Sequence, residues 1–270
     1  MDQLQRKLDD VPDYQFREVV SVKKKLEPKQ IKPFLSDGSM TGAALQQDKD
    51  LVPWDSESVE KALRHAIVSN DTVELKAVLK DNPFLFIELA SRKDFQQPVF
   101  RDVRISPDET IDFVWLNDNS DGPEWVLVKI TEPSMAVMEG KYPSQSLSRS
   151  IDIVQSWRTE ITNNSELRKK LFGAVTRLRI IVVGGSGAAW KESHAVAWRA
   201  SHNTESHIEV RSSNVFERSL QMLKDSPDHF WGVRKNPVTR PSSELPDYLQ
   251  AYGYLEFWIG LTSSKQEPGE

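Results

Sequence analysis

The spacing of hydrophobic and polar positions changes along the chain from a helical repeat to an alternating one and back. Between residues 56 and 79 apolar side chains recur every three or four positions in two runs, which predicts two amphipathic helices. From residue 97 to 131 β-branched and aromatic residues alternate with polar ones, which predicts strands. Residues 144–163 return to helical spacing, and 179–184 are continuously apolar, as in a strand that is buried on both faces.

The two early helices carry recognisable start signals. Ser56 is the expected N-cap of the first, and Asp71 begins the second with Glu74 at capping-box spacing. The second helix is expected to bury Val73, Leu75, Val78 and Leu79. Further along, the pattern predicts a helix over 191–201, a strand over 207–211 and a helix over 214–224.

An antiparallel hairpin is the central prediction. Its strands are Ile111–Leu116 and Trp125–Thr131, and a run of turn formers, 117–123, separates them. Because successive strand residues point to opposite faces, Val126, Val128 and Ile130 share the face expected to form the core. The opposite face carries Leu127, Lys129 and Thr131, and Asp112 belongs to the partner strand.

A glycine cluster follows the apolar strand, at residues 184–187. It lacks the Gly-Lys-Ser/Thr ending of a phosphate-binding loop and the spacing of a dinucleotide fold. A nucleotide site and a tight turn after the strand both remain as interpretations, and the missing residues favour the turn.

The composition of the chain excludes several classes of protein. The 270 residues include no cysteine, which excludes disulfides and thiol catalysis, and no run approaches the roughly 20 apolar residues of a membrane span. The start of the chain lacks a signal-peptide pattern, so we expect a cytoplasmic protein. The net charge is −5, yet residues 141–179 hold eight basic and three acidic side chains. This stretch is either a DNA-binding surface or an ordinary solvated one.

The hairpin resembles the core of PD-(D/E)XK nucleases, in which an Asp on one strand faces a (D/E)-x-K sequence on the next. Asp112 fits the first position, whereas Lys129 stands in the acid position and Thr131 in the lysine position. The stretch 73–224 also resembles the Shedu family of antiphage-defence proteins, which carry such a domain. The segments that carry this resemblance are LKDNPFLF at 79–86, IDFV at 111–114, WVLVKITEP at 125–133, IDIVQSWR at 151–158, IIVVGG at 180–185 and FERSL at 216–220.

The resemblance implies a site as well as a fold. By this resemblance, Asp112 is a metal-binding acid and Asp102 occupies the position of an upstream acid. Gln155 is a site residue contributed by the helix beside the site. If the nuclease is active, Mg²⁺ is its expected cofactor. Glu132 is then the first candidate for the missing carboxylate, with Glu124 and Glu139 nearby.

We therefore expect an α/β (α+β) fold with a restriction-endonuclease-like mixed sheet flanked by helices. Residues 1–50 are expected as an irregular arm, 51–95 as a helical segment, 96–225 as the nuclease-like core, and 226–270 as a tail on the core or on a partner subunit.

Three hypotheses for function follow. The first is a metal-dependent DNA endonuclease with a rearranged site. The second, which the two replaced motif positions favour, is a pseudonuclease that acts by DNA binding or assembly, with Asp112 and Lys129 as an internal ion pair. The third is an interaction protein that no longer binds nucleic acid. DNA, a second copy of the chain and a defence-system protein are the expected partners, and no membrane.

Overall fold

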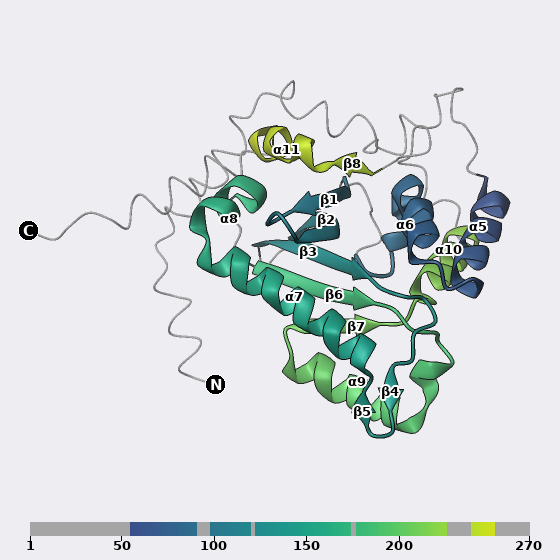
Figure 1. Ribbon diagram of the computed structural model, residues 1–270. Coiled ribbons are helices and arrows are strands. Elements are labelled where there is room, and N and C mark those ends of the chain that lie inside the picture. The colour runs from purple at the N-terminus through teal and green to yellow at the C-terminus, as the bar shows by residue number, and fades with distance from the viewer. Residues whose placement is uncertain (1–54, 91–97, 120–121, 174–176, 226–238, 252–270) are drawn as a thin grey trace, which may run out of the picture.

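The computed structural model describes residues 55–90, 98–119, 122–173, 177–225 and 239–251, without the side chains of 118, 119, 122 and 251. Within these residues a six-stranded mixed sheet lies between helices, which confirms the expected fold class (Figure 1). The arm 1–50 and most of the tail 226–270 lie outside the described residues. No helix in the described part of the chain is long and apolar enough to cross a membrane.

The elements follow the predicted order closely. The strands are β1 (Phe100–Arg104), β2 (Thr110–Asn119), β3 (Gly122–Ile130), β4 (Met138–Glu139), β5 (Tyr142–Pro143), β6 (Arg177–Val183), β7 (Ile208–Arg211) and β8 (Arg240–Pro241). The helices are α5 (Ser56–Val68), α6 (Thr72–Asp81), α7 (Gln145–Asn163), α8 (Ser165–Phe172), α9 (Ser193–Glu205), α10 (Val215–Asp225) and α11 (Leu245–Ala251). Short 3₁₀ turns lie at Pro83–Phe86, Ala189–Lys191 and Ser242–Glu244.

The sheet order is β7-β6-β3-β2-β1-β8. β1, β2 and β3 pair antiparallel in succession, β6 and β7 continue parallel to β3, and β8 runs parallel to β1. The hairpin is longer than predicted, because the ladder continues through the expected turn formers as far as the Asn119–Gly122 pair. The helix α7 makes the crossover between the parallel strands β3 and β6, as such a connection requires.

Both faces of the hairpin are core, which corrects the expectation of one core face and one site face. Val126, Val128 and Phe113 share a hydrophobic cluster with residues of α5, α6 and α10. Leu127 and Val114 share another with residues of α7, α8 and α11. The described part of the predicted helical segment, 55–90, therefore packs directly on the sheet, and Figure 1 shows its two helices beside α10.

The helix starts differ in detail from the sequence predictions. Asp55 caps α5, in place of the expected Ser56, because its side chain accepts from the Ser58 N–H. Asp71 caps α6 as predicted, accepting from the N–H groups of Val73 and Glu74. The expected burial of Val73 is wrong, since this side chain in the first turn is 78% exposed.

The glycine cluster forms a tight turn after β6. Gly185 has a φ of 70°, a conformation that side chains other than glycine rarely adopt. The N–H of Gly184 donates to the Arg211 carbonyl at 3.0 Å, and the N–H of Gly185 to the Glu132 carbonyl at 3.1 Å. Because protein acceptors already use these donors, the arrangement favours the turn over a phosphate-binding loop.

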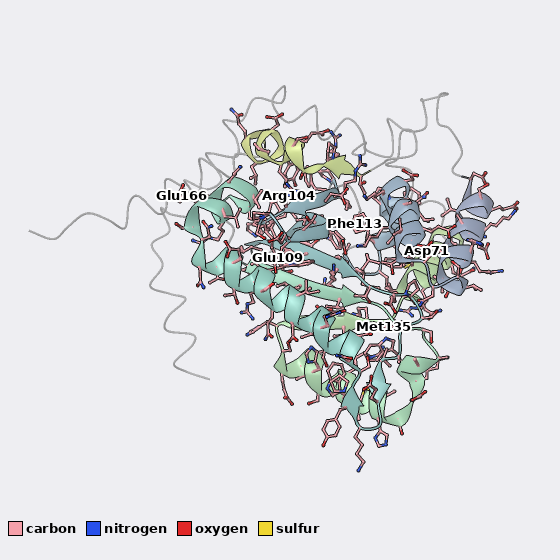
Figure 2. The ribbon with its side chains drawn as sticks, in the orientation of Figure 1. Asp71, Arg104, Glu109, Phe113, Met135 and Glu166 are labelled. Carbon is pink, nitrogen blue, oxygen red and sulfur yellow. The ribbon has the colours of Figure 1, made fainter. Side chains whose placement is uncertain are left out.

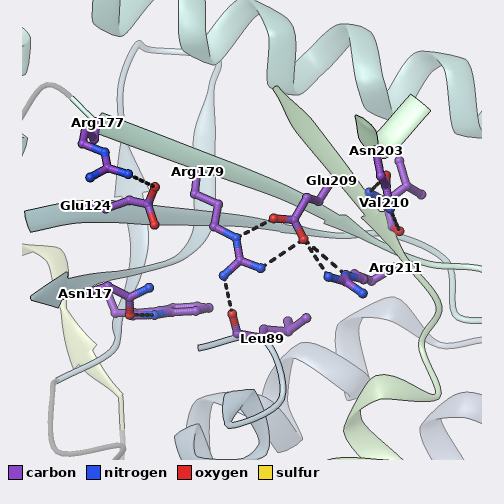
Figure 3. Close-up of polar contacts among 10 residues, drawn as sticks. Leu89, Asn117, Glu124, Arg177, Arg179, Asn203, Glu209, Val210 and Arg211 are labelled. Carbon is purple, nitrogen blue, oxygen red and sulfur yellow. Dashed lines mark hydrogen bonds and ion pairs between the residues drawn. The ribbon is translucent and has the colours of Figure 1, made fainter. Parts of the chain in front are cut away.

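The edge strand β7 is covered by a side chain of α9. The Val210 N–H donates to Oδ1 of Asn203 at 2.8 Å, and Nδ2 of Asn203 donates to the Val210 carbonyl at 3.2 Å (Figure 3). The Asn203 amide thus hydrogen-bonds both the backbone N–H and the carbonyl of Val210, as a neighbouring strand would. Such cover protects a sheet edge from pairing with another chain.

A stack of rings joins α9 to the turn before it. Trp198 stacks on Trp190, with ring centroids 6.3 Å apart, and on His202, with centroids 4.6 Å apart. The Nε2 atom of His202 is buried, and the described part of the chain offers it no hydrogen-bond partner. Burial lowers the pKa of His202 below its ordinary value of 6.5, against the raising effects of the Ile208 backbone and Glu205.

Acid should therefore weaken the fold through His202. As the pH falls below 6.5, His202 takes up a proton more readily in the unfolded chain than in the folded one. The free energy of unfolding therefore decreases as the pH falls from 6.5 to the lowered pKa of the folded state. Urea unfolding at about pH 7.5 and about pH 5.5 measures this. We expect His202→Gln to reduce the difference between the two pH values, and His194→Gln, at an exposed position of the same helix, to leave it unchanged.

Candidate functional site

Two acidic side chains meet α6 at the end of the sheet where β2 begins and β3 ends. The register pairs Arg101 with Phe113 and Val103 with Ile111, so Asp102 and Asp112 lie opposite each other between these pairs. Asp102 has a φ of 53°, a left-handed conformation that is uncommon outside glycine. In Figure 2 the labelled Phe113 lies beside α6, with which it shares a hydrophobic cluster.

Asp112 is buried, and both of its carboxylate oxygens are engaged. Oδ1 accepts from Nζ of Lys76 on α6 at 2.7 Å. Oδ2 accepts from the backbone N–H of Ile130 at 2.7 Å and lies 3.9 Å from Nζ of Lys129. The carboxylate is thus held by one backbone donor and two lysines, which is the internal ion pair expected of a pseudonuclease together with a second lysine.

Asp102 repeats this arrangement closer to solvent. Its Oδ2 atom lies 2.8 Å from Nζ of Lys80 and 3.8 Å from Nε of Arg101. Lys76 and Lys80 are one helical turn apart on α6, so each meets one of the two adjacent strands. Neither lysine was recognisable as a site residue from the sequence. Their four-residue spacing on a predicted helix was the available signal, but nothing in the sequence placed that helix over the motif.

Lys129 lies on the other side of Asp112 from Lys76. Its Nζ atom is 5.7 Å from the centroid of the Trp157 ring on α7, a cation–π contact, and its side chain is 21% exposed. Trp157 is fully buried, and its Nε1 atom has no hydrogen-bond partner in the described part of the chain. Lys129 is therefore held between a carboxylate and an aromatic face.

Thr131 does not join this group. Its hydroxyl donates to the Val183 carbonyl at 3.1 Å, and it packs against Gly184, where an added Cβ would come within 1.8 Å of the hydroxyl oxygen. The structure thus brings together Asp112 and Lys129 but directs Thr131 to the end of β6. A lysine at position 131, which the nuclease motif requires, would have to displace this close packing.

The other candidate residues lie apart from Asp112. Gln155 is exposed on α7, and Glu132 is exposed in the loop after β3. Glu124 is at the far end of β3, 4.0 Å from Arg177. Glu139 accepts from the N–H of Gln145 at 3.3 Å. No contact in the described part of the chain links any of these four to the Asp112 carboxylate.

The side chains present do not fit a Mg²⁺ site. In the described ranges no group of three or more His, Cys, Asp or Glu side chains is placed to hold a metal ion. The two carboxylates at this end of the sheet, Asp112 and Asp102, are each bonded to a lysine at 2.8 Å or less. A cation entering here would meet the charges of Lys76 and Lys129, and repulsion at short range in a partly buried site is strong.

Part of the basic stretch 141–179 is already neutralised by neighbouring acids (Figure 3). Arg179 contacts Glu209 at 2.5 and 3.0 Å and donates to the Leu89 carbonyl at 2.7 Å. Arg211 donates to the same Glu209 at 2.9 Å. Burial raises the pKa of Glu209, but the hydrogen bonds and charges of Arg179 and Arg211 lower it more, and the net shift is downward from 4.5. Through Leu89, this network connects the end of the segment 55–90 to β6.

The other basic side chains of the stretch 141–179 lie mainly on α7 and α8. Arg149 and Arg158 belong to α7, and Arg168, Lys169 and Lys170 to α8, where Lys169 forms an exposed ion pair with Glu166 at 3.8 Å. Two features thus bear on function, a lysine-neutralised acid pair and a basic helix surface. No protein-family model matches the chain, and no curated protein matches it either.

Proposed function

We propose that this chain is a Shedu-like antiphage-defence protein, a pseudonuclease that keeps a nuclease-type fold and acts by binding DNA. The observation that carries the proposal is the pairing of Asp112 with Lys76 and Lys129. A nuclease would use the acid of this position to hold a metal ion, and here two ammonium groups take that place. A protein of this kind would act in the cytoplasm, as an oligomer or with a partner protein of the defence system.

The surface of α7 and α8 supports DNA as the partner. Its basic side chains face solvent or are half-buried, and they project from two consecutive helices. Cations on such a surface can neutralise backbone phosphates without reading the base sequence. We therefore infer non-specific, salt-dependent binding to duplex DNA.

The proposal predicts that the purified protein does not cleave DNA with Mg²⁺ or Mn²⁺. The site offers too few free carboxylates for a catalytic metal ion, even one that keeps several waters. The assay is plasmid nicking with each metal, by wild type beside Asp112→Ala and Asp112→Asn at a temperature where both variants are folded. Robust cleavage that both substitutions abolish would establish the alternative, an active endonuclease with a rearranged site. Glu132 would then be the first residue to replace.

DNA binding is expected without any metal. Affinity for a short duplex in EDTA should fall steeply as salt rises from about 50 to about 200 mM, because each phosphate contact releases counterions. Replacing Arg168, Lys169 and Lys170 together by glutamine should reduce both the affinity and its salt dependence. Binding that does not depend on salt would contradict binding through phosphate contacts. No binding even at low salt would leave the third hypothesis, an interaction protein without a nucleic-acid role.

A further inference from the structure

The side chains around Asp112 and Asp102 carry more positive charge than these acids neutralise. Four cations, Lys76, Lys80, Arg101 and Lys129, contact two carboxylates. Each carboxylate has one near cation, at 2.7 or 2.8 Å, and one more distant cation, at 3.8 or 3.9 Å. Counted over the described residues alone, the group therefore holds a surplus of two positive charges.

The two surplus cations differ in how well they are satisfied. The guanidinium of Arg101 also donates to the carbonyl and hydroxyl of Thr239, at 2.9 and 3.1 Å. Within the described ranges Lys129 contacts the distant carboxylate oxygen and the Trp157 ring. The oxygen it approaches is already bonded to the Ile130 N–H. The Lys129 side chain is about four-fifths covered and has no close carboxylate among the described residues, so its charge is less well compensated than that of Lys76.

We infer that Lys129, together with Lys76, binds a backbone phosphate of DNA without a metal ion. This inference rests on the proposed function, and it specifies which residues contact the DNA at the position of the nuclease motif. A phosphodiester oxygen beside Lys129 would supply the missing close anion, and a lysine is a suitable point charge for it. The second lysine offsets the repulsion that Asp112 would otherwise exert on the phosphate. The ammonium groups thus take over the electrostatic role that a metal has in a nuclease.

A purely structural role for Lys129 predicts a different outcome on substitution. If Lys129 holds the fold together, its removal weakens the protein. If its charge is surplus, Lys129→Met removes a poorly compensated cation, keeps the apolar stem against Trp157, and leaves the Lys76–Asp112 pair in place. Stability and binding therefore separate the two roles.

The experiment compares wild type with Lys129→Met and with the matched control Lys61→Met, an exposed lysine of α5. Thermal unfolding is measured with and without inorganic phosphate, and binding to a short duplex is measured in EDTA over a salt series. We expect Lys129→Met to unfold at the wild-type temperature or above. Its duplex affinity should drop roughly tenfold at low salt, and the slope of log affinity against log salt should fall by about 0.9, as for one lost phosphate contact. Lys61→Met should match wild type in all of these measurements.

Each outcome decides a separate point. If Lys129→Met retains wild-type binding in full, Lys129 does not contact the phosphate, while the proposed DNA binding stands. A variant that is clearly less stable than wild type would show that Lys129 stabilises the fold and that its charge is not surplus, which overturns the inference. If wild type binds no DNA, the proposed function fails, and so does the choice of a DNA phosphate as ligand. In that case, if phosphate stabilises wild type and Lys61→Met but not Lys129→Met, a local anion site remains. If phosphate stabilises none of the three, the local anion site is ruled out as well.

Discussion

Replacing Asp112 by alanine is expected to lower the free energy of unfolding by about 3 kcal/mol, because it leaves partly buried cations without their counter-charge. Lys76 and Lys129 are 27% and 21% exposed, so neither can regain full hydration without moving. The Ile130 N–H also loses its acceptor. Urea unfolding of wild type and variant at neutral pH measures the effect.

Asp102→Asn, which removes the charge but keeps a side chain suited to the left-handed backbone at this position, provides the control for this prediction. Asp102 faces the same helix and also pairs with a lysine, but its side chain is 53% exposed against 10% for Asp112. Exposed ion pairs contribute little, so we expect a loss of about 1 kcal/mol or less. Equal effects of the two substitutions would contradict the assignment of Asp112 as the acid on which this end of the sheet depends.

Glu209→Gln is expected to destabilise the protein by about 2–3 kcal/mol, since Arg179 and Arg211 then share an amide in place of a carboxylate. The side chains of Arg179 and Glu209 are 16% and 23% exposed, so water compensates only in part. The comparison is Arg218→Ala, which breaks an ion pair with Glu88 between side chains that are 54% and 32% exposed. We expect this control to lose less than about 1 kcal/mol.

The acid dependence of stability gives a second measure of Glu209. Its folded pKa is below the ordinary 4.5, so the pair's contribution is complete above pH 4.5 and is lost as the pH falls through the lowered folded value. We expect Glu209→Gln to flatten the decline in unfolding free energy below pH 4.5. If Glu209→Gln were as stable as wild type at neutral pH, the negative charge of Glu209 in the Arg179–Glu209–Arg211 network would contribute nothing to stability, since a neutral amide would replace it fully.

The elements around the site show why prediction succeeded for the fold and fell short for the site. The hairpin, the buried strand β6 and the helix α7 were evident because their apolar spacing repeats over many residues, and many side chains then agree on one structure. Lys76 and Lys80 were not recognisable as site residues, since a lysine on a helix is ordinary until the face opposite it is known. Thr131 was misplaced because one residue past the end of β3 the alternation of side chains no longer holds.

The sequence by itself determined the mixed sheet with flanking helices, the N-cap of α6 and the presence of Lys129 and Thr131 in place of the acid and the lysine of a nuclease motif, since each depends on local spacing and residue type. Only the tertiary structure decided which cations neutralise Asp112 and Asp102, because that depends on how α6 packs against two strands that lie further along the chain. The same holds for Thr131, whose surroundings are set by the parallel strand β6 and by Gly184. Interactions between distant segments depend on packing geometry, which local periodicity does not specify.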